Sequence, residues 1–81
     1  LDHATTREVL AERGDRYGEF KDHAKLCQDL KTVMRTGKSW NDCSNTHKQA
    51  LEVIADKIAR MLNGDPNYED NIVDIIGYSQ L

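Results

Sequence analysis

The chain has 81 residues, one proline and a formal net charge of -3, from 11 Lys+Arg and 14 Asp+Glu. Folded domains run from roughly 50 to 250 residues, so residues 1–81 are expected to form a single domain. Because proline interrupts helices whereas Ala, Leu, Glu, Lys and Arg favour them, the composition predicts an all-α fold and disfavours an all-β one.

Charge and hydropathy also exclude several classes of protein. Binding to DNA or RNA needs a basic stripe that displaces counterions, so nucleic acid is not expected as the main partner of this acidic chain. No apolar run approaches the roughly 20 residues that span a bilayer, and no cationic segment leads into a signal-peptide core, so we expect a cytoplasmic protein without a membrane partner. Cys27 and Cys43 leave room for at most one disulfide. A start at Leu1 instead of Met leaves open an extension of the natural chain beyond Leu1 or Leu81.

Two helices are predicted in the first half of the chain. The first spans residues 5–13 and begins at a threonine cap, and residues 15–18 then form a turn in which Gly18 takes a positive φ. The second spans residues 19–35, and Gly37 is expected to end it in the left-handed conformation. Apolar residues at spacings of three and four form its buried stripe. They are Phe20, Ala24, Leu26, Cys27, Leu30, Val33 and Met34.

Two further helices are predicted in the second half. Residues 38–43 form a loop whose Trp40 needs a covering surface. The third helix spans residues 46–63, and the helix-breaking run Asn-Gly-Asp-Pro over residues 63–66 separates it from a fourth helix over residues 68–81. The expected core positions are Leu51, Ile54, Ala55, Ile58, Met61 and Leu62 on the third helix, and Ile72, Ile75 and Ile76 on the fourth.

The connections between these elements are short, which favours antiparallel packing of neighbouring helices. The sequence therefore predicts a small bundle of about four helices with a C-terminal antiparallel helical hairpin. Apolar residues left at its edge, such as Val73 and Leu81, would be buried by self-association, so a homo-oligomer is expected.

Acidic pairs form the first candidate site. Glu52 and Asp56 are four residues apart on the third helix, and Asp70 and Asp74 repeat that spacing on the fourth, so each pair shares a helix face. Across a hairpin, the four carboxylates are candidate ligands for Mg²⁺, which prefers oxygen and accepts substrate phosphates into its shell.

The same helices offer a simpler interpretation of these acids. Lys57 and Arg60 lie close to them in the sequence, and either base is within reach of Asp70 or Asp74 across the hairpin. In that arrangement the carboxylates form salt bridges and hold no metal. If a phosphate were bound, Lys57 and Arg60 would be the residues that meet it.

A second candidate site combines cysteine and histidine. His23 and Cys27 are four residues apart, as are Cys43 and His47, so each pair can present both ligands from one helical turn to tetrahedral zinc. The order of the ligands differs from that of the common zinc fingers. The alternative is a buried Cys27, which lies in an apolar stripe, with histidines scattered over the surface.

A third candidate lies beside the first predicted turn. Arg13, Arg16 and Tyr17 combine guanidinium groups with an aromatic ring, which suits phosphate binding or stacking on a base. The alternative places Tyr17 with Phe20 as an apolar plug at one end of the bundle.

Three stretches together resemble a family of short phage and prophage proteins without an assigned activity. The first runs from Glu12-Arg13 to Tyr17-Gly18, and the second is Lys-Ile-Ala-Arg at residues 57–60, followed by Gly-Asp-Pro at residues 64–66. The third is the closing helix, with Asp70 and then Val-Asp-Ile-Ile-Gly-Tyr at residues 73–78. This resemblance implies a helical protein of phage or mobile-element origin.

The last helix is also distantly similar to that of the MazG-type all-α nucleotide pyrophosphohydrolases. Those enzymes hold magnesium with E-E-x-x-E on one helix and E-x-x-D on another, whereas Asn71 stands here three residues before Asp74. The resemblance implies metal ligation by Glu52, Asp56, Asp70 and Asp74, with Lys57 or Arg60 at the phosphate.

Two classes of function follow from these observations. The first is a binding or interaction module that self-associates and recognises a protein partner. The second is a Mg²⁺-dependent nucleotide pyrophosphohydrolase or nucleotide-binding protein, in which the metal activates water for attack on a phosphate. Convergence of the four acids without neutralising bases would favour the enzyme, and exposed apolar side chains would favour the module.

Overall fold

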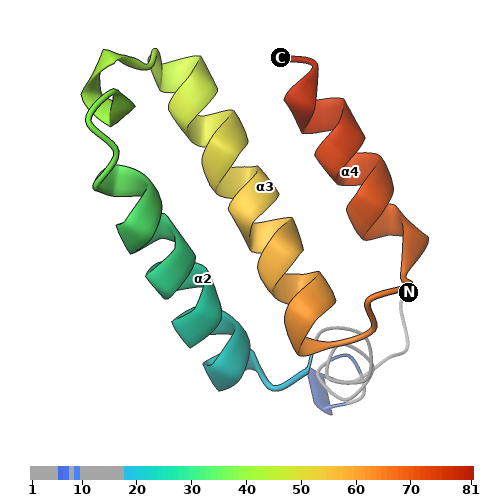
Figure 1. Ribbon diagram of the computed structural model, residues 1–81. Helices are drawn as coiled ribbons and strands as arrows, with labels where there is room; N and C mark the ends of the chain where they lie inside the picture. Colours follow the sequence, from blue (N-terminus) through green and yellow to red (C-terminus); the bar gives the residue numbers. More distant parts are fainter. Residues whose placement is uncertain (1–5, 8, 10–17) are drawn as a thin grey trace.

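The computed structural model describes residues 6, 7, 9 and 18–81, and this part of the chain is all-helical (Figure 1). Its long helices are α2 (Phe20–Arg35), α3 (Asn45–Asn63) and α4 (Glu69–Ser79), and a 3-10 turn, η1 (Trp40–Asp42), lies between α2 and α3. The prediction of an all-α fold is confirmed. Most of the first predicted helix, residues 5–13, lies outside the described residues, so the structure shows three long helices where four were expected.

The three helices lie side by side, with α3 between α2 and α4 (Figure 1). Each helix runs antiparallel to its neighbour in the chain, and α3 and α4 form the predicted C-terminal hairpin. Helix α3 packs against both other helices, whereas α2 and α4 scarcely touch each other. The described helices therefore form one layer, and a four-helix bundle closed around a core is not confirmed.

Side chains accept backbone hydrogen bonds at the start of α3 and in the turn before α4. Ser44 precedes α3, and its Oγ accepts a hydrogen bond from the backbone N of His47 at 3.1 Å. Before α4, the Asp65 carboxylate accepts from a backbone N–H two residues later, at 2.9 Å. Such bonds satisfy N–H groups that would otherwise lack a partner at a turn or a helix start.

Two glycines had predicted roles, and one prediction is wrong. Gly18 has the expected positive φ of 77°, and a β-carbon there would collide with the backbone of Asn63 at the end of α3. Asn63 also donates from Nδ2 to the Glu19 carbonyl at 3.1 Å, which ties the start of α2 to the end of α3. Gly37, in contrast, does not have a positive φ. Helix α2 instead ends in a tightened turn, in which the N–H groups of Thr36 and Gly37 each bond a carbonyl three residues earlier.

Burial differs most from the prediction. The fully buried residues among those described are small or polar: Cys27, Ala50, Ala55, Ala59 and Asn71. The large side chains of the predicted core stripes stay partly exposed instead, so their predicted burial is wrong for the single chain. The exposed fraction is 68% for Leu62 and 54% for Ile76. Alanines let α3 approach its neighbours closely, and in a single layer the larger side chains must then project from the faces.

Candidate functional site

A row of polar side chains joins α2 to α3, and we call it the polar seam. On α2 its members are four residues apart, a spacing that places them on one face of the helix. Those on α3 have the same spacing and face α2. The polar seam consists of His23, Cys27, Lys31 and Arg35 on α2 with Glu52 and Asp56 on α3.

Both acids of the polar seam are paired with bases of α2. The Lys31 Nζ lies 2.8 Å from Oδ1 of Asp56, and the Cys27 thiol donates a hydrogen bond to the same oxygen. Arg35 Nη2 lies 3.1 Å from Oε1 of Glu52. The Lys31 side chain is only 13% exposed, so its charge depends on the Asp56 carboxylate for neutralisation.

Proton affinities follow from these contacts. Burial disfavours the Asp56 carboxylate, but the hydrogen bonds from Cys27 and Lys31 outweigh burial, so the pKa of Asp56 lies below its ordinary value. Its hydrogen bond with Asp56 raises the pKa of Lys31. Burial, and then the bond to Asp56, raise the pKa of the Cys27 thiol, which therefore stays protonated and is a poor nucleophile or metal ligand.

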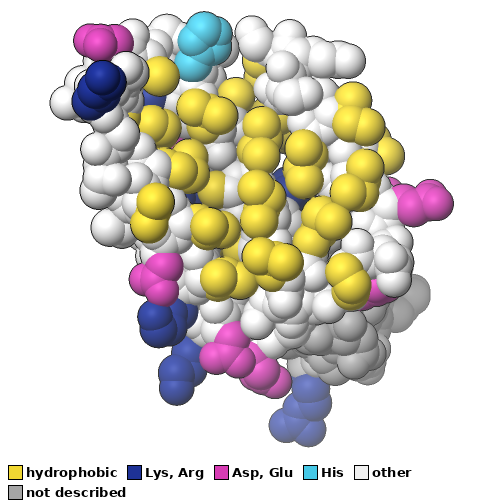
Figure 2. Space-filling view, viewed as in Figure 1, with side chains coloured by type: hydrophobic (Ala, Val, Ile, Leu, Met, Phe, Trp, Pro, Cys, Tyr) yellow, Lys and Arg dark blue, Asp and Glu magenta, His cyan; other side chains and the backbone are white. Residues whose placement is uncertain are grey.

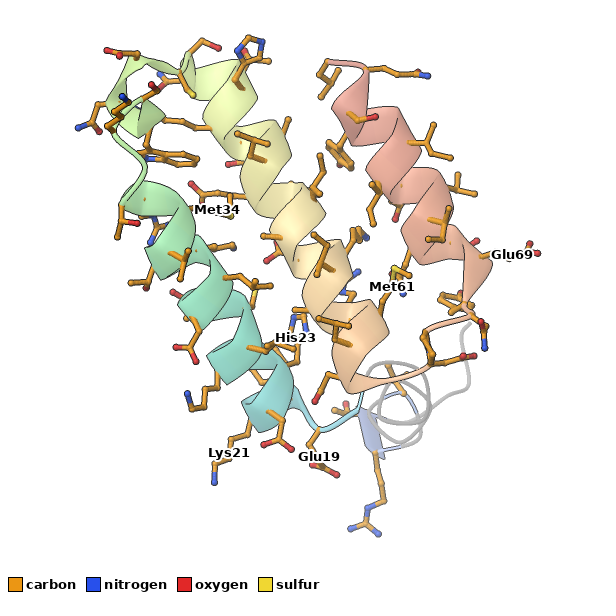
Figure 3. The ribbon with its side chains drawn as sticks, viewed as in Figure 1. Glu19, Lys21, His23, Met34, Met61 and Glu69 are labelled. Carbon is orange, nitrogen blue, oxygen red and sulfur yellow. The ribbon has the colours of Figure 1, made fainter. Side chains whose placement is uncertain are left out.

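His23 lies between α2 and α3 at the lower end of the polar seam (Figure 3). Its Nδ1 is buried and has no hydrogen-bond partner in the structure. Burial, followed by the positive charge of Arg60, lowers the pKa of His23, although the Asp56 carboxylate acts in the opposite direction. The neutral imidazole is therefore the form that suits this position.

The contact between α3 and α4 contains a second set of polar groups. Lys57 Nζ lies 2.7 Å from Oδ2 of Asp74, which is one of the salt bridges expected across the hairpin. The Tyr68 hydroxyl donates to Oδ2 of Asp70 at 2.9 Å. Asn71 is the largest fully buried side chain, and its Nδ2 has no partner in the structure. Asn71 was not among the predicted core residues, although its position one turn before Asp74 places it on the side of α4 that faces α3.

The four predicted magnesium ligands are not brought together. Glu52 and Asp56 face α2, whereas Asp74 is paired with a lysine of α3 and Asp70 with a tyrosine hydroxyl. Within the described residues no group of three or more His, Cys, Asp and Glu side chains is placed to hold a metal ion. Of the salt bridges expected with Lys57 or Arg60, the structure shows that of Lys57 with Asp74, whereas Glu52 and Asp56 pair with bases of α2 that were not predicted.

The other predicted sites have different outcomes. His23 and Cys27 lie on the first half of α2, whereas Cys43 and His47 lie around the start of α3, so the structure does not assemble the four-ligand zinc site. Arg60, a predicted phosphate contact, already interacts with another group of the chain. The predicted positions Arg13, Arg16 and Tyr17 lie outside the described residues.

Many of the residues that were predicted to form the core instead form a continuous apolar surface. Figure 2 shows hydrophobic side chains gathered over all three helices on one face, with most of the charged side chains around the edge. The face includes an open groove between α2 and α3 of about 360 Å³. We call this surface the apolar face. The residues that line its groove are Leu30, Met34, Trp40, Leu51, Ile54, Ala55 and Ile58, and beyond the groove it includes Leu62 on α3 and Ile72, Val73 and Ile76 on α4.

Trp40 obtains part of its predicted cover in this groove. The ring is partly buried by the side chains of α2 and α3, and the Lys48 ammonium lies 6.0 Å from the centre of the ring. A cation at this distance is at the limit of a favourable interaction with an aromatic face. The turn η1 therefore closes the upper end of the groove with an aromatic wall.

Comparison of the chain with protein-family models, with curated proteins and with solved structures finds no match. Among the helices of the described residues, none combines the length and the apolar composition that crossing a bilayer requires.

Proposed function

We propose that this chain is a small helical interaction module of phage or mobile-element origin that acts through its apolar face. One observation carries the proposal: a face rich in exposed apolar side chains extends over all three described helices, with most of the charged side chains at its edge (Figure 2). Large apolar patches on soluble proteins mark surfaces that bind other proteins. The resemblance to short phage and prophage proteins supports the assigned origin.

The polar groups of the chain support the same function. Charges in the polar seam are paired within the chain, as is Lys57 with Asp74, so none of these pairs needs a ligand for neutralisation. Many of the large apolar side chains, in contrast, remain exposed to water. Binding driven by such side chains follows from the hydrophobic effect and requires no metal or cofactor.

The finer architecture belongs to this proposal. We propose that residues 5–13 form a fourth helix, which agrees with helical backbone at Thr6, Arg7 and Val9. The module is proposed to work as a homo-oligomer in the cytoplasm, because a partner that covers the apolar face removes the exposed apolar surface from water.

The alternative function is that of a MazG-like, magnesium-dependent nucleotide pyrophosphohydrolase. In it Glu52, Asp56, Asp70 and Asp74 hold the metal, and Lys57 and Arg60 meet the phosphates. The observation that favours this alternative is the spacing of Asp70 and Asp74, which are four residues apart on α4. Metal binding would require Asp56 to release Lys31 and Asp74 to release Lys57.

A thermal-shift titration separates the two functions. The full chain is heated with Mg²⁺ or Mn²⁺, alone and with a panel of nucleoside triphosphates, beside the variants Asp74→Asn and Asp29→Asn. Asp29 is an exposed acid of α2 and serves as the matched control. A ligand that binds only the folded state raises the unfolding midpoint, so the interaction module predicts no metal-dependent nucleotide shift. A shift that is lost in Asp74→Asn and kept in Asp29→Asn would overturn the proposed function in favour of the enzyme.

A further inference from the structure

We propose that the occupant of the apolar face is a second copy of this chain, packed face to face about a twofold axis with α3 of one copy crossing α3 of the other. The inference rests on the proposed function and names its partner. Helix α3 is the middle helix of the layer, so a symmetric contact centred on the apolar face places the two α3 helices at its centre (Figure 1).

The single layer is the first argument for a second copy. A helix that is apolar along one stripe must bury that stripe against another element, and stable domains therefore contain at least two layers. Here the contacts between helices of the layer are filled by alanines and Cys27, and the large side chains remain outside. A second three-helix layer supplies an apolar surface of matching extent.

The pattern along α3 fits such a contact. Leu51, Ile54, Ile58 and Met61 follow one another at spacings of three, four and three residues. This is the alternation that places apolar side chains on the seam between two packed helices. The row is also free of charged residues, as are the cores of homodimer interfaces.

The extent of the apolar face is the second argument. Exposed fractions of 41% for Leu51, 68% for Leu62 and 62% for Val73, with those of their neighbours, amount to apolar surface on the order of 600 Å². A stable interface buries about 800 Å² on each partner, its polar rim included. The apolar face thus lies at the upper end of the patches found on monomers and could supply most of the area that each partner contributes to a dimer.

The segment that precedes α2 is poor in large apolar side chains. Residues 1–17 contain four large apolar side chains, Leu1, Val9, Leu10 and Tyr17. One of them, Val9, is itself 42% exposed. A second copy, in contrast, presents an apolar surface of the same extent in return.

Sedimentation equilibrium over a wide range of protein concentration tests the dimer. The variants are Leu62→Glu and Val73→Glu, at two of the most exposed positions of the apolar face, so that the fold of the single chain is preserved. Gln49→Glu is the control, because Gln49 is exposed and precedes Glu52 and Asp56 by three and seven residues, which places it on the opposite side of α3. All samples are checked for unchanged helical circular dichroism.

The wild-type chain and Gln49→Glu are expected to sediment with twice the mass of the chain. Each face variant buries two carboxylates in a symmetric contact, so its dimer dissociation constant should rise about 100-fold or more. A wild-type chain that stays monomeric at millimolar concentration would overturn the proposal, as would face variants that dimerise like the control.

Disulfide trapping tests the crossing of the two α3 helices. One cysteine is introduced as Ile54→Cys or Ile58→Cys in a Cys43→Ser background that keeps the buried Cys27, with Gln49→Cys as the control. A twofold axis near the middle of α3 brings one or both of these positions close to its own counterpart, so oxidation should yield covalent dimers there and none at residue 49. Dimers that crosslink at neither position would contradict the proposed geometry.

The two proposals fail in different ways. A monomeric chain without a metal-dependent nucleotide shift overturns the second copy as occupant, and the homo-oligomer with it, and leaves an interaction module with a different partner. A metal-dependent nucleotide shift that requires Asp74 overturns the module itself, whatever the state of assembly.

Discussion

Helix α3 has two sides with opposite properties. On the side of the polar seam, Asp56 and Glu52 meet bases from α2 at 2.8 and 3.1 Å, and the charges are neutralised within the chain. On the side of the apolar face, Leu51, Ile58 and Leu62 remain in contact with water. The ion pairs of the polar seam are therefore formed within the described part of the chain, whereas the large side chains of the apolar face are left without a covering element. Helix α3 has its charges neutralised on one side and its hydrophobic stripe exposed on the other.

The polar seam also fixes how α2 lies along α3. Arg35 pairs with Glu52, and Lys31 pairs with Asp56. The second pair lies four residues nearer the start of α2 and four residues nearer the end of α3, as expected for antiparallel helices. Partly buried ion pairs add little net stability, but a shifted register would leave their charges unpaired at a high cost. The seam therefore specifies the antiparallel register, and the alanines of α3 set the distance between the helices.

The largest expected effect comes from enlarging a buried alanine. Ala59 is 0% exposed, so Ala59→Leu inserts three carbons where the helices meet and should destabilise the fold by about 3 kcal/mol. Leu62→Ala removes the same atoms from a side chain that is mostly in water, and should cost less than about 0.5 kcal/mol in the monomer. Urea unfolding at a concentration where the chain is monomeric measures both. Equal costs would contradict the division between small buried and large exposed residues.

Removal of the acid shared by Lys31 and Cys27 should have the next largest effect. Asp56→Ala leaves the ammonium of Lys31 unpaired and should lower the free energy of unfolding by roughly 2 to 3 kcal/mol. This loss is at or below the range for a fully buried pair, because 33% of the Asp56 side chain is exposed. Asp29→Ala, which breaks the exposed pair with Lys25, should leave the urea midpoint nearly unchanged. The double variant Lys31→Met with Asp56→Leu should recover much of the loss. No recovery would show that Asp56 contributes more than neutralisation.

Two glycines should respond to alanine with opposite signs. Gly18→Ala places a β-carbon against Asn63 at a φ of 77° and should destabilise the fold by about 2 kcal/mol. Gly77→Ala meets no atom within 4 Å inside helix α4, and the better helix propensity should stabilise by roughly 0.5 to 1 kcal/mol. Thermal unfolding of the two variants beside the wild type measures both shifts. A loss in Gly77→Ala that grows with protein concentration would place Gly77 inside the dimer contact.

Local sequence signals predicted the helices well. The predicted second and third helices differ from α2 and α3 by one residue at the start, and the predicted end at residue 81 lies two residues beyond Ser79. Caps, prolines and glycines act over a few residues, so their effects can be derived from the sequence. Burial depends on how many layers pack together, and a stripe of apolar residues does not contain that information. The large side chains of the stripes on α3 and α4 were therefore assigned to a core, whereas many of them are exposed on the three described helices.

The candidate site was predictable to a similar extent. Spacing placed Glu52 with Asp56 on one helix face, and the short hairpin connection made a pairing of Lys57 with Asp74 predictable. The pairing of Asp56 with Lys31 was not predicted, because two residues on separate helices meet only in one register. The burial of Asn71 was not predicted, because burial on a helix is inferred from the spacing of apolar residues, and Asn71 is a polar residue that follows two acids.

The smallest expected effect concerns the pH dependence of stability, and it tests the polar seam at its lower end. His23 faces Lys31 on its own helix and Asp56 and Arg60 on α3, and burial lowers its pKa below the ordinary value near 6.5. The unfolded chain then binds a proton more readily than the folded one. Stability from His23 is full above pH 6.5 and is lost as the pH falls through the lowered value. The urea midpoint should be lower at pH 5.5 than at pH 7.5 for the wild type, at pH values where carboxylates stay ionised. The control His47→Gln, which replaces an exposed histidine, should show the same fall. In His23→Gln the fall should be smaller, and an unchanged fall would place the titrating group elsewhere in the chain.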